Sequence, residues 1–205
     1  MTFNDCFQWL TLLLYQVKLT NRFDNQNGSE CLLSVDGTDY SIQEPTPFDP
    51  MWYSHKIQGP AVRYEVAICI QTGSIVWTCG PFPAGDFPDL EIFKSGLKNE
   101  LIRGEKVETD EGYRGDFNVR TPSDYEGNEV WRIMKGQARA RHETINRNLK
   151  EFNVLRNKFR HDPNKHYLGF HAVVAVVQSE ILSGRSTYQI EYDVRREISS
   201  YADED

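Results

Sequence analysis

The chain is poor in cysteine, in long apolar runs and in positive charge. Its cysteines show neither a CxxC pair nor the dense spacing of a disulfide scaffold, so we interpret them as buried thiols in a reducing compartment and expect no zinc site. The apolar stretch over residues 9–17 is too short to span a bilayer and follows no basic signal region. We therefore expect a soluble, intracellular protein. The four cysteines are Cys6, Cys31, Cys69 and Cys79.

The overall charge limits how the chain could bind nucleic acid. A net charge of −7 and a pI near 5.3 exclude binding by total charge alone, because phosphate neutralisation requires clustered Lys and Arg. Any DNA contact must therefore come from a local basic surface. The 205 residues, with 39% hydrophobic and 12% aromatic content, are enough for one good-sized core, so we expect a single domain.

Hydrophobic periodicity predicts a mixed order of helices and strands. Apolar residues at helical spacing, or in short β-rich runs bounded by Gly and Pro, mark each element. This order is typical of the α/β class, and the acidic tail beyond Tyr192 should fray. The expected elements are helices over 3–19, 89–101, 137–161 and 167–182, a buried strand over 31–35, a hairpin of strands 64–71 and 74–79, and a short strand over 106–109.

Three carboxylates occupy positions that a divalent-metal site requires. Asp36 and Asp110 are expected at the ends of two strands, and Glu143 on a following helix, opposite its apolar stripe. Carboxylate oxygens are the hard ligands that Mg²⁺ and Mn²⁺ prefer. In a two-metal site, ions about 4 Å apart activate the attacking hydroxyl and stabilise the leaving oxygen of a phosphodiester displacement.

Each of these acids also has a simpler explanation. Asp36-Gly37 could be an ordinary turn after a strand, Asp110 could start a loop, and Glu143 could lie on a solvated helix face. The three are informative only if a sheet brings the two strand ends together and a helix lies across them. Spacing along the sequence does not decide whether this happens.

Basic residues surround Glu143 on the predicted helix. Arg147 and Lys150 share its helical face, and such a face could hold DNA phosphates. A solvated helix with surface ion pairs is the preferred interpretation until the acids are shown to converge. The basic residues of this helix are Arg139, Arg141, Arg147 and Lys150, and a second, weaker group comprises His55, Lys56 and Arg63.

Four ordered blocks of the sequence carry a resemblance to a known family. Residues 34–38 (SVDGT) resemble the "DGTH" strand end, and residues 52–56 (WYSHK) the "yySgK" segment, of the DDE superfamily endonucleases of PIF/Harbinger-type transposases. These are similar to the wider RNase H-like transposase and integrase group. The next block runs from Gly73 through GDFPD (85–89) to Phe93 and resembles "G…pGsxhDxxif".

Two further blocks follow in the same order. Residues 109–113 (TDEGY) resemble "aDsGY", and residues 138–150, which contain RHE, resemble "xxRxxvExxfgxlK". The resemblance spans roughly residues 32–177. The ordered combination of the four blocks is more specific than any block alone.

The resemblance implies a metal-dependent DNA endonuclease and strand transferase. Its catalytic residues would be Asp36, Asp110 and Glu143, which would hold two Mg²⁺ or Mn²⁺ ions. Asp89 corresponds to a further family acid, but we expect it to be structural because Pro88 stands where the family has His. The expected DNA contacts are Arg139, Arg147 and Lys150.

The resemblance also implies a fold, partners and a location. The fold would be an RNase H-like mixed sheet of about five strands, flanked by helices on both faces. The partners would be transposon-end and target DNA, with a separate Myb-like DNA-binding protein, and the location would be the nucleus.

The expected organisation departs from the family at the N-terminus. Residues 1–30 form a helix and linker with no recognisable DNA-binding module, residues 31–185 form the catalytic domain, and residues 186–205 form an acidic tail. One alternative is therefore an inactive, truncated or domesticated transposase remnant that binds DNA or protein. A second is an ordinary α/β domain with accidental block matches, in which the three acids would lie far apart.

Overall fold

A computed structural model of the chain describes residues 16–23, 31–125, 127, 129–185 and 187. The expected helix over 3–19 and the tail beyond Tyr192 fall mostly or wholly outside these residues. Within the described ranges, no helix is both long and apolar enough to cross a membrane. Among the described cysteines, Cys31 and Cys69 are buried, as expected, and Cys79 is half-buried.

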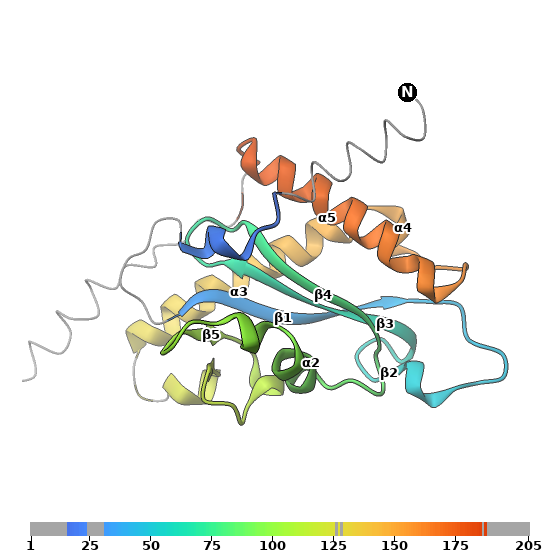
Figure 1. Cartoon of the computed structure of the whole chain (residues 1–205), viewed down its shortest axis with the longest axis horizontal. Coiled ribbons are helices and arrows are strands. Elements are labelled where there is room, and N and C mark those ends of the chain that lie inside the picture. The colour runs from blue at the N-terminus through green and yellow to red at the C-terminus, as the bar shows by residue number, and fades with distance from the viewer. Residues whose placement is uncertain (1–15, 24–30, 126, 128, 186, 188–205) are drawn as a thin grey trace, which may run out of the picture.

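A mixed sheet of six strands forms the centre of the molecule (Figure 1). The long strands β1, β3 and β4 pair antiparallel, and the short strands β5 and β6 continue from β1 in parallel. This is the RNase H-like mixed sheet that we expected, with the two-residue β2 added beside β3. The strands are β1 (Cys31–Ser41), β2 (Tyr53–Ser54), β3 (Gly59–Cys69), β4 (Ile75–Pro83), β5 (Lys106–Glu108) and β6 (Val119–Arg120).

Helices cover both faces of this sheet, as the resemblance implied. Figure 1 shows α3, α4 and α5 on one side and α2 on the other. The helices are α2 (Asp89–Ser95), α3 (Glu129–Leu149), α4 (Asn153–Arg156) and α5 (His166–Leu182). Short 3-10 helices span Leu19–Phe23, Pro50–Trp52, Leu97–Glu100, Glu111–Tyr113, Pro122–Tyr125 and Pro163–Lys165.

The alternation of side chains along the strands divides the core between the two faces. Tyr40 of β1 and Tyr64 of β3 pack with α3 and α5, where Tyr64 stacks on Phe170 at 3.7 Å between ring centroids. Leu33 and Val35 of β1 face the other way and pack with α2. Even-numbered residues of β1 therefore face α3, which places Asp36 on the α3 side of the sheet.

Several expected boundaries were wrong. The strand predicted to end at Asp36 continues to Ser41, because β1 keeps pairing with β3 through Asp36↔Val66 and Gly37↔Glu65. The helix predicted over 137–161 is α3, which begins at Glu129 and ends at Leu149. Its apolar period continues past that end because Leu155, on the separate helix α4, packs into the same core.

The helix expected over 89–101 breaks at Gly96 and continues as a 3-10 turn. The hairpin was predicted correctly, although β3 begins and β4 ends beyond the predicted limits. The last helix was also correct to within one residue.

A buried carboxylate lies on the α2 side of β3. Glu65 is fully buried; Trp77 Nε1 donates to its Oε1 at 3.2 Å, while Oε2 has no hydrogen-bond partner among the described residues. Burial raises the pKa of Glu65 to about 8, the Trp77 hydrogen bond opposes this rise, and the charge of Asp89 adds to it. Between pH 4.5 and about 8 the folded chain therefore binds more protons here than the unfolded chain.

We predict that this group makes the protein less stable as pH rises through that window. The free energy of unfolding of Glu65→Gln, whose amide does not titrate, should therefore rise relative to that of the unmodified chain from pH 5 to pH 8. His142, His166 and His171, whose pKa values burial lowers, contribute the opposite slope, but equally in both proteins. Denaturant unfolding at pH 5, 6.5 and 8 measures this, with the exposed Glu91→Gln as control. Equal pH dependence in the unmodified chain and Glu65→Gln would contradict the assignment.

Candidate functional site

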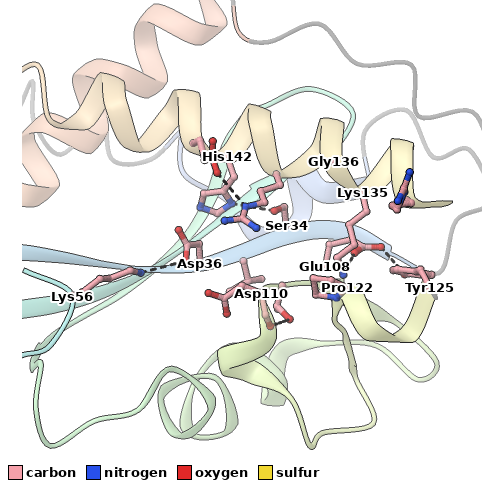
Figure 2. A pocket seen from close by; sticks show the side chains of 15 residues that line it. Ser34, Asp36, Lys56, Glu108, Asp110, Pro122, Tyr125, Lys135, Gly136 and His142 are labelled. Carbon is pink, nitrogen blue, oxygen red and sulfur yellow. Dashed lines mark hydrogen bonds and ion pairs between the residues drawn. The ribbon is translucent and has the colours of Figure 1, made fainter. Parts of the chain in front are cut away.

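The pairing of β1 with β5 sets the positions of the two aspartates. These strands run parallel and their last paired residues are Ser34 and Glu108. Two residues further along each chain stand Asp36 and Asp110, one on a strand that continues and the other just past the end of β5. Parallel neighbours advance together, so the two carboxylates reach the same level of the sheet, as Figure 2 shows.

Local hydrogen bonds fix the backbone around Asp110. Its carboxylate Oδ1 accepts from the Gly112 N–H at 2.9 Å and caps the 3-10 helix Glu111–Tyr113. Asp110 was therefore correctly expected to follow a strand and to start a turn. The capping role and a metal-binding role are compatible, because a carboxylate has two oxygens with several lone pairs.

Asp36 is held from two sides. Asn146 of α3 donates from Nδ2 to Asp36 Oδ2 at 3.0 Å. Lys56 Nζ lies 3.9 Å from Asp36 Oδ1 and donates to the Gly37 carbonyl at 2.8 Å. The Asp36 side chain is 31% exposed, so it opens to solvent while its orientation is constrained.

Glu143 lines the same cavity as the two aspartates but is not turned between them. Its side chain is 64% exposed and forms an ion pair with Arg139, one turn earlier, at 3.1 Å. The residues of α3 that face β1 are His142, whose Nδ1 lies 3.1 Å from Ser34 Oγ, and Asn146. His142 and Asn146, one helical turn apart on α3, thus contact Ser34 and Asp36, which are two residues apart on β1.

These positions bear on the metal expectation. In the part of the chain that the structure describes, no three His, Cys, Asp or Glu side chains are grouped closely enough to hold a metal ion. Asp36 and Asp110 nevertheless provide two hard-oxygen donors on neighbouring chains. Glu143 could join them by a rotamer change, since an exposed ion pair with Arg139 is worth little. Carboxylate oxygens such as these are the donor type that Mg²⁺ and Mn²⁺ prefer.

A cavity of about 420 Å³ connects these residues. It runs beneath α3 from the two aspartates to a hydrogen-bonded group at the edge of β5. There Glu108 accepts from the Tyr125 hydroxyl at 2.7 Å and pairs with Lys135 at 2.9 Å. The lining comprises Ser34, Val35, Asp36, Lys56, Glu108, Thr109, Asp110, Pro122, Tyr125, Arg132, Lys135, Gly136, Arg139, His142 and Glu143.

Asp89 is closer to the site than the sequence suggested. A Cβ at Gly37 would lie 2.0 Å from Asp89 Oδ1, and one at Gly112 would lie 3.5 Å from Asp89 Oδ2. Both glycines therefore leave room for this carboxylate beside Asp36 and Asp110. Burial raises the pKa of Asp89, whereas Arg63, 3.3 Å away, opposes the rise. The sequence feature that could have indicated this is a glycine close behind each acid: Gly37 directly follows Asp36, and Gly112 follows Asp110 by two residues.

The basic residues expected near Glu143 have different roles. Arg139 lines the cavity, and Arg147 and Lys150 are exposed. Lys150 Nζ lies 5.5 Å from the Tyr40 ring centroid, and burial lowers its pKa. Arg141, in contrast, is buried and donates to the carbonyls of Ile70 and Gln71 at 2.7 and 2.6 Å, so it holds the β3–β4 hairpin and is not part of the exposed basic surface.

The second basic group is also divided. Lys56 lies beside Asp36, but Arg63 binds Asp39 through two hydrogen bonds, at 2.7 and 2.9 Å, and is mostly buried. His55 packs edge-on against Tyr53. Only Lys56 of this group therefore contributes to the site.

Comparison with known proteins adds one relative. It is the "Probable transposase for insertion sequence element IS702" of Microchaete diplosiphon, 26% identical over 165 residues that cover 74% of this chain and 58% of the relative. The chain is similar to a transposase. It spans less than two thirds of that relative's length. No family model matches the chain, and no solved structure matches it.

We predict that Gly37 tolerates no side chain. Gly37→Ala should destabilise the fold by about 1–3 kcal/mol, because its methyl group would overlap the Asp89 carboxylate. Gly136→Ala is the matched control: no atom lies within 4 Å of its Cβ, so in a helix it should be neutral or stabilising by up to about 1 kcal/mol. Thermal and denaturant unfolding measure both; a Gly37→Ala variant as stable as the control would refute the packing argument.

Proposed function

We propose that the chain carries the catalytic domain of a DDE-type transposase that cuts and rejoins DNA. The observation that supports this most directly is the β1–β5 register, which brings Asp36 and Asp110 to one level in a cavity that Glu143 also lines. The RNase H-like sheet and the similarity to a transposase agree with it. The second alternative expects the acids to lie far apart, whereas all three line one cavity.

The residues around the acids have separate tasks in this proposal. Asp36, Asp110 and Glu143 would hold two Mg²⁺ or Mn²⁺ ions, which activate a water or 3′-hydroxyl and stabilise the leaving oxygen. Asn146 and Lys56 orient the Asp36 carboxylate. The charge of Lys56 also reduces repulsion between the carboxylates before any cation binds.

DNA would be the partner, held along the outer side of α3. Arg139, Arg147 and Lys150 are the proposed phosphate contacts, because Arg139 and Arg147 are exposed on the helix that carries Glu143 and Lys150, also exposed, directly follows its end. With a net charge of −7, the chain depends on this local surface, so binding should be weak and sensitive to salt. The PIF/Harbinger type, the nuclear location and a separate Myb-like partner are finer parts of the proposal and come from the resemblance alone.

A remnant that binds DNA without cutting it is the competing function. The pairing of Glu143 with Arg139, outside the space between the aspartates, favours it. A metal-binding measurement distinguishes the two functions. In a catalytic site Glu143 must leave Arg139 to bind a metal ion, whereas a DNA-binding remnant requires no such movement.

We predict that the unmodified chain binds Mn²⁺ and that Asp36→Asn and Asp110→Asn each abolish binding, since each removes a charged oxygen donor. Calorimetric titration at neutral pH measures this, with circular dichroism to show that the variants fold. Asp86→Asn, an exposed aspartate away from the cavity, is the control. Absence of binding by the unmodified chain, or binding that survives both substitutions, would support the remnant.

We further predict Mn²⁺-dependent nicking of supercoiled plasmid by the unmodified chain. Asp110→Asn should reduce the rate by more than about 100-fold, because losing a ligand should exceed the roughly 10–100-fold effect of losing an outer hydrogen bond to a ligand. Gel electrophoresis of time courses gives the rates, again with Asp86→Asn as control. Nicking by Asp110→Asn at the unmodified rate would remove Asp110 from the mechanism.

A further inference from the structure

The cations of one stretch of the chain lack acidic partners. Residues 147–165 run from the end of α3 through α4 to the start of α5 (Figure 1) and contain six Lys and Arg but two Asp and Glu, a net charge of +4 in a chain of net charge −7. All six cationic side chains are exposed, and none forms an ion pair with a residue that the structure describes. This stretch, the basic segment, carries Arg147, Lys150, Arg156, Lys158, Arg160 and Lys165.

The two acids of the basic segment are engaged elsewhere. Glu151 Oε2 accepts from Arg185 at 2.7 Å. Asp162 Oδ1 accepts from the Asn164 N–H at 3.0 Å and caps the 3-10 helix Pro163–Lys165. On the first half of α3, by contrast, exposed arginines pair with acids of the same helix. The positive charge of the basic segment is therefore uncompensated, and an anionic partner would relieve the repulsion between its cations.

Backbone pairing fixes the middle of the basic segment at the end of β1. The Phe159 N–H donates to the Ser41 carbonyl at 2.9 Å, and the Phe159 carbonyl accepts from the Gln43 N–H at 2.7 Å. The Phe159 ring packs against the core on the α3 side of the sheet. Neighbouring side chains of an extended chain point in opposite directions, so Lys158 and Arg160 point to solvent from a fixed backbone.

The chain passes beside the basic segment again after α5. This helix ends at Leu182, and the Arg185 N–H donates to the Glu180 carbonyl at 2.9 Å. The Arg185 side chain then binds Glu151, which directly follows Lys150. The residues after Arg185 therefore start next to the basic segment.

Those residues carry the opposite charge. Residues 188–205 contain six Asp and Glu and two Arg, a net charge of −4 that matches the +4 of the basic segment. Fully extended, these 18 residues span about 60 Å. The far end of the basic segment at Lys165 lies one length of α5 away, about 25 Å for its 17 residues. Residues 188–205 are therefore long enough to reach all six cations. Their acids are Glu191, Asp193, Glu197, Asp203, Glu204 and Asp205.

We propose that residues 188–205 bind to the basic segment of the same chain. Their carboxylates pair with its exposed Lys and Arg side chains. Because both partners belong to one chain, their effective concentration is on the order of millimolar, and individually weak exposed pairs suffice. The contact covers Arg147 and Lys150, so it competes with DNA phosphates for two of the proposed DNA contacts. Only this effect on DNA rests on the proposed function; the contact itself does not.

Carbodiimide cross-linking tests the contact in the full, unmodified chain. This reagent joins a carboxylate to a lysine amine only where the two touch, and peptide mass spectrometry locates the link. We expect links from residues 188–205 to Lys150, Lys158 and Lys165 at low ionic strength, and roughly fivefold fewer in 1 M NaCl, where the Debye length is about 3 Å. Absence of these links, or a yield that salt does not change, would overturn the proposal.

A mixture of isotope-labelled and unlabelled chains separates contacts within a chain from contacts between chains. We expect each linked peptide pair to carry one label state, because both peptides come from one molecule. Links that join labelled to unlabelled peptides in the proportion of random mixing would identify a second copy as the partner and would exclude binding within the chain.

Arginine variants test the charge of the basic segment without removing a reactive lysine. Arg156→Glu with Arg160→Glu should lower the yield of the links by at least about fivefold, because two attractive charges become repulsive. Arg103→Glu with Arg114→Glu, two exposed arginines outside the segment, is the matched control and should leave the yield unchanged. Circular dichroism shows that both proteins fold. Equal yields in the two variants would contradict the proposed contact.

DNA binding measures the consequence of the contact. Glu204→Gln with Asp205→Asn should tighten binding to a DNA duplex by about threefold, the effect of losing two exposed competing ion pairs. Fluorescence anisotropy in EDTA measures this without metal. Asp86→Asn with Glu91→Gln changes the total charge equally at exposed positions elsewhere and should have a smaller effect. Equal tightening by both pairs would overturn the competition, whereas cross-links without any DNA binding would support the contact and remove the proposed function.

Discussion

Parallel pairing between β1 and β5 is the constraint on which the site depends. It involves few residues, since β5 has only three, yet it decides that Asp36 and Asp110 advance together from Ser34 and Glu108. A shift of one residue would turn one of the aspartates to the opposite face. The surrounding core resists such a shift, because Leu33 and Val107 are fully buried in one cluster with the residues of α2.

The helix α3 forms the second boundary of the site; its inner face packs on the sheet, and its outer face carries charged residues. Ile145 and Leu149 anchor it on the sheet, while His142 and Asn146 contact the polar side chains of β1. Glu143 lies on the outer side with the basic residues. Metal-dependent catalysis therefore requires one exposed side chain to turn inward, whereas the anchored face of the helix can stay in place.

The position of the partly buried Asp89 carboxylate depends on two glycines and on an ion pair. The Asp89 carboxylate occupies the space that side chains at Gly37 and Gly112 would fill, and Arg63 connects it to Asp39. Asp36 and Asp110 thus share a neighbour of the same charge, which Arg63 and Lys56 compensate. In the proposed function, this concentration of acids is the electrostatic condition that favours binding of a divalent cation.

The sequence alone determined the class of fold, the hairpin and the last helix, because periodicity and local motifs depend on neighbours along the chain. It did not determine that β1 continues past Asp36, since that extension comes from pairing with β3. It also placed Arg141 on a basic surface, although the structure buries it against the Ile70 and Gln71 carbonyls. The direction of Glu143, the nearness of Asp89 and the cavity between α3 and the sheet were decided by tertiary structure, because each depends on segments that are distant in sequence and packed together in space.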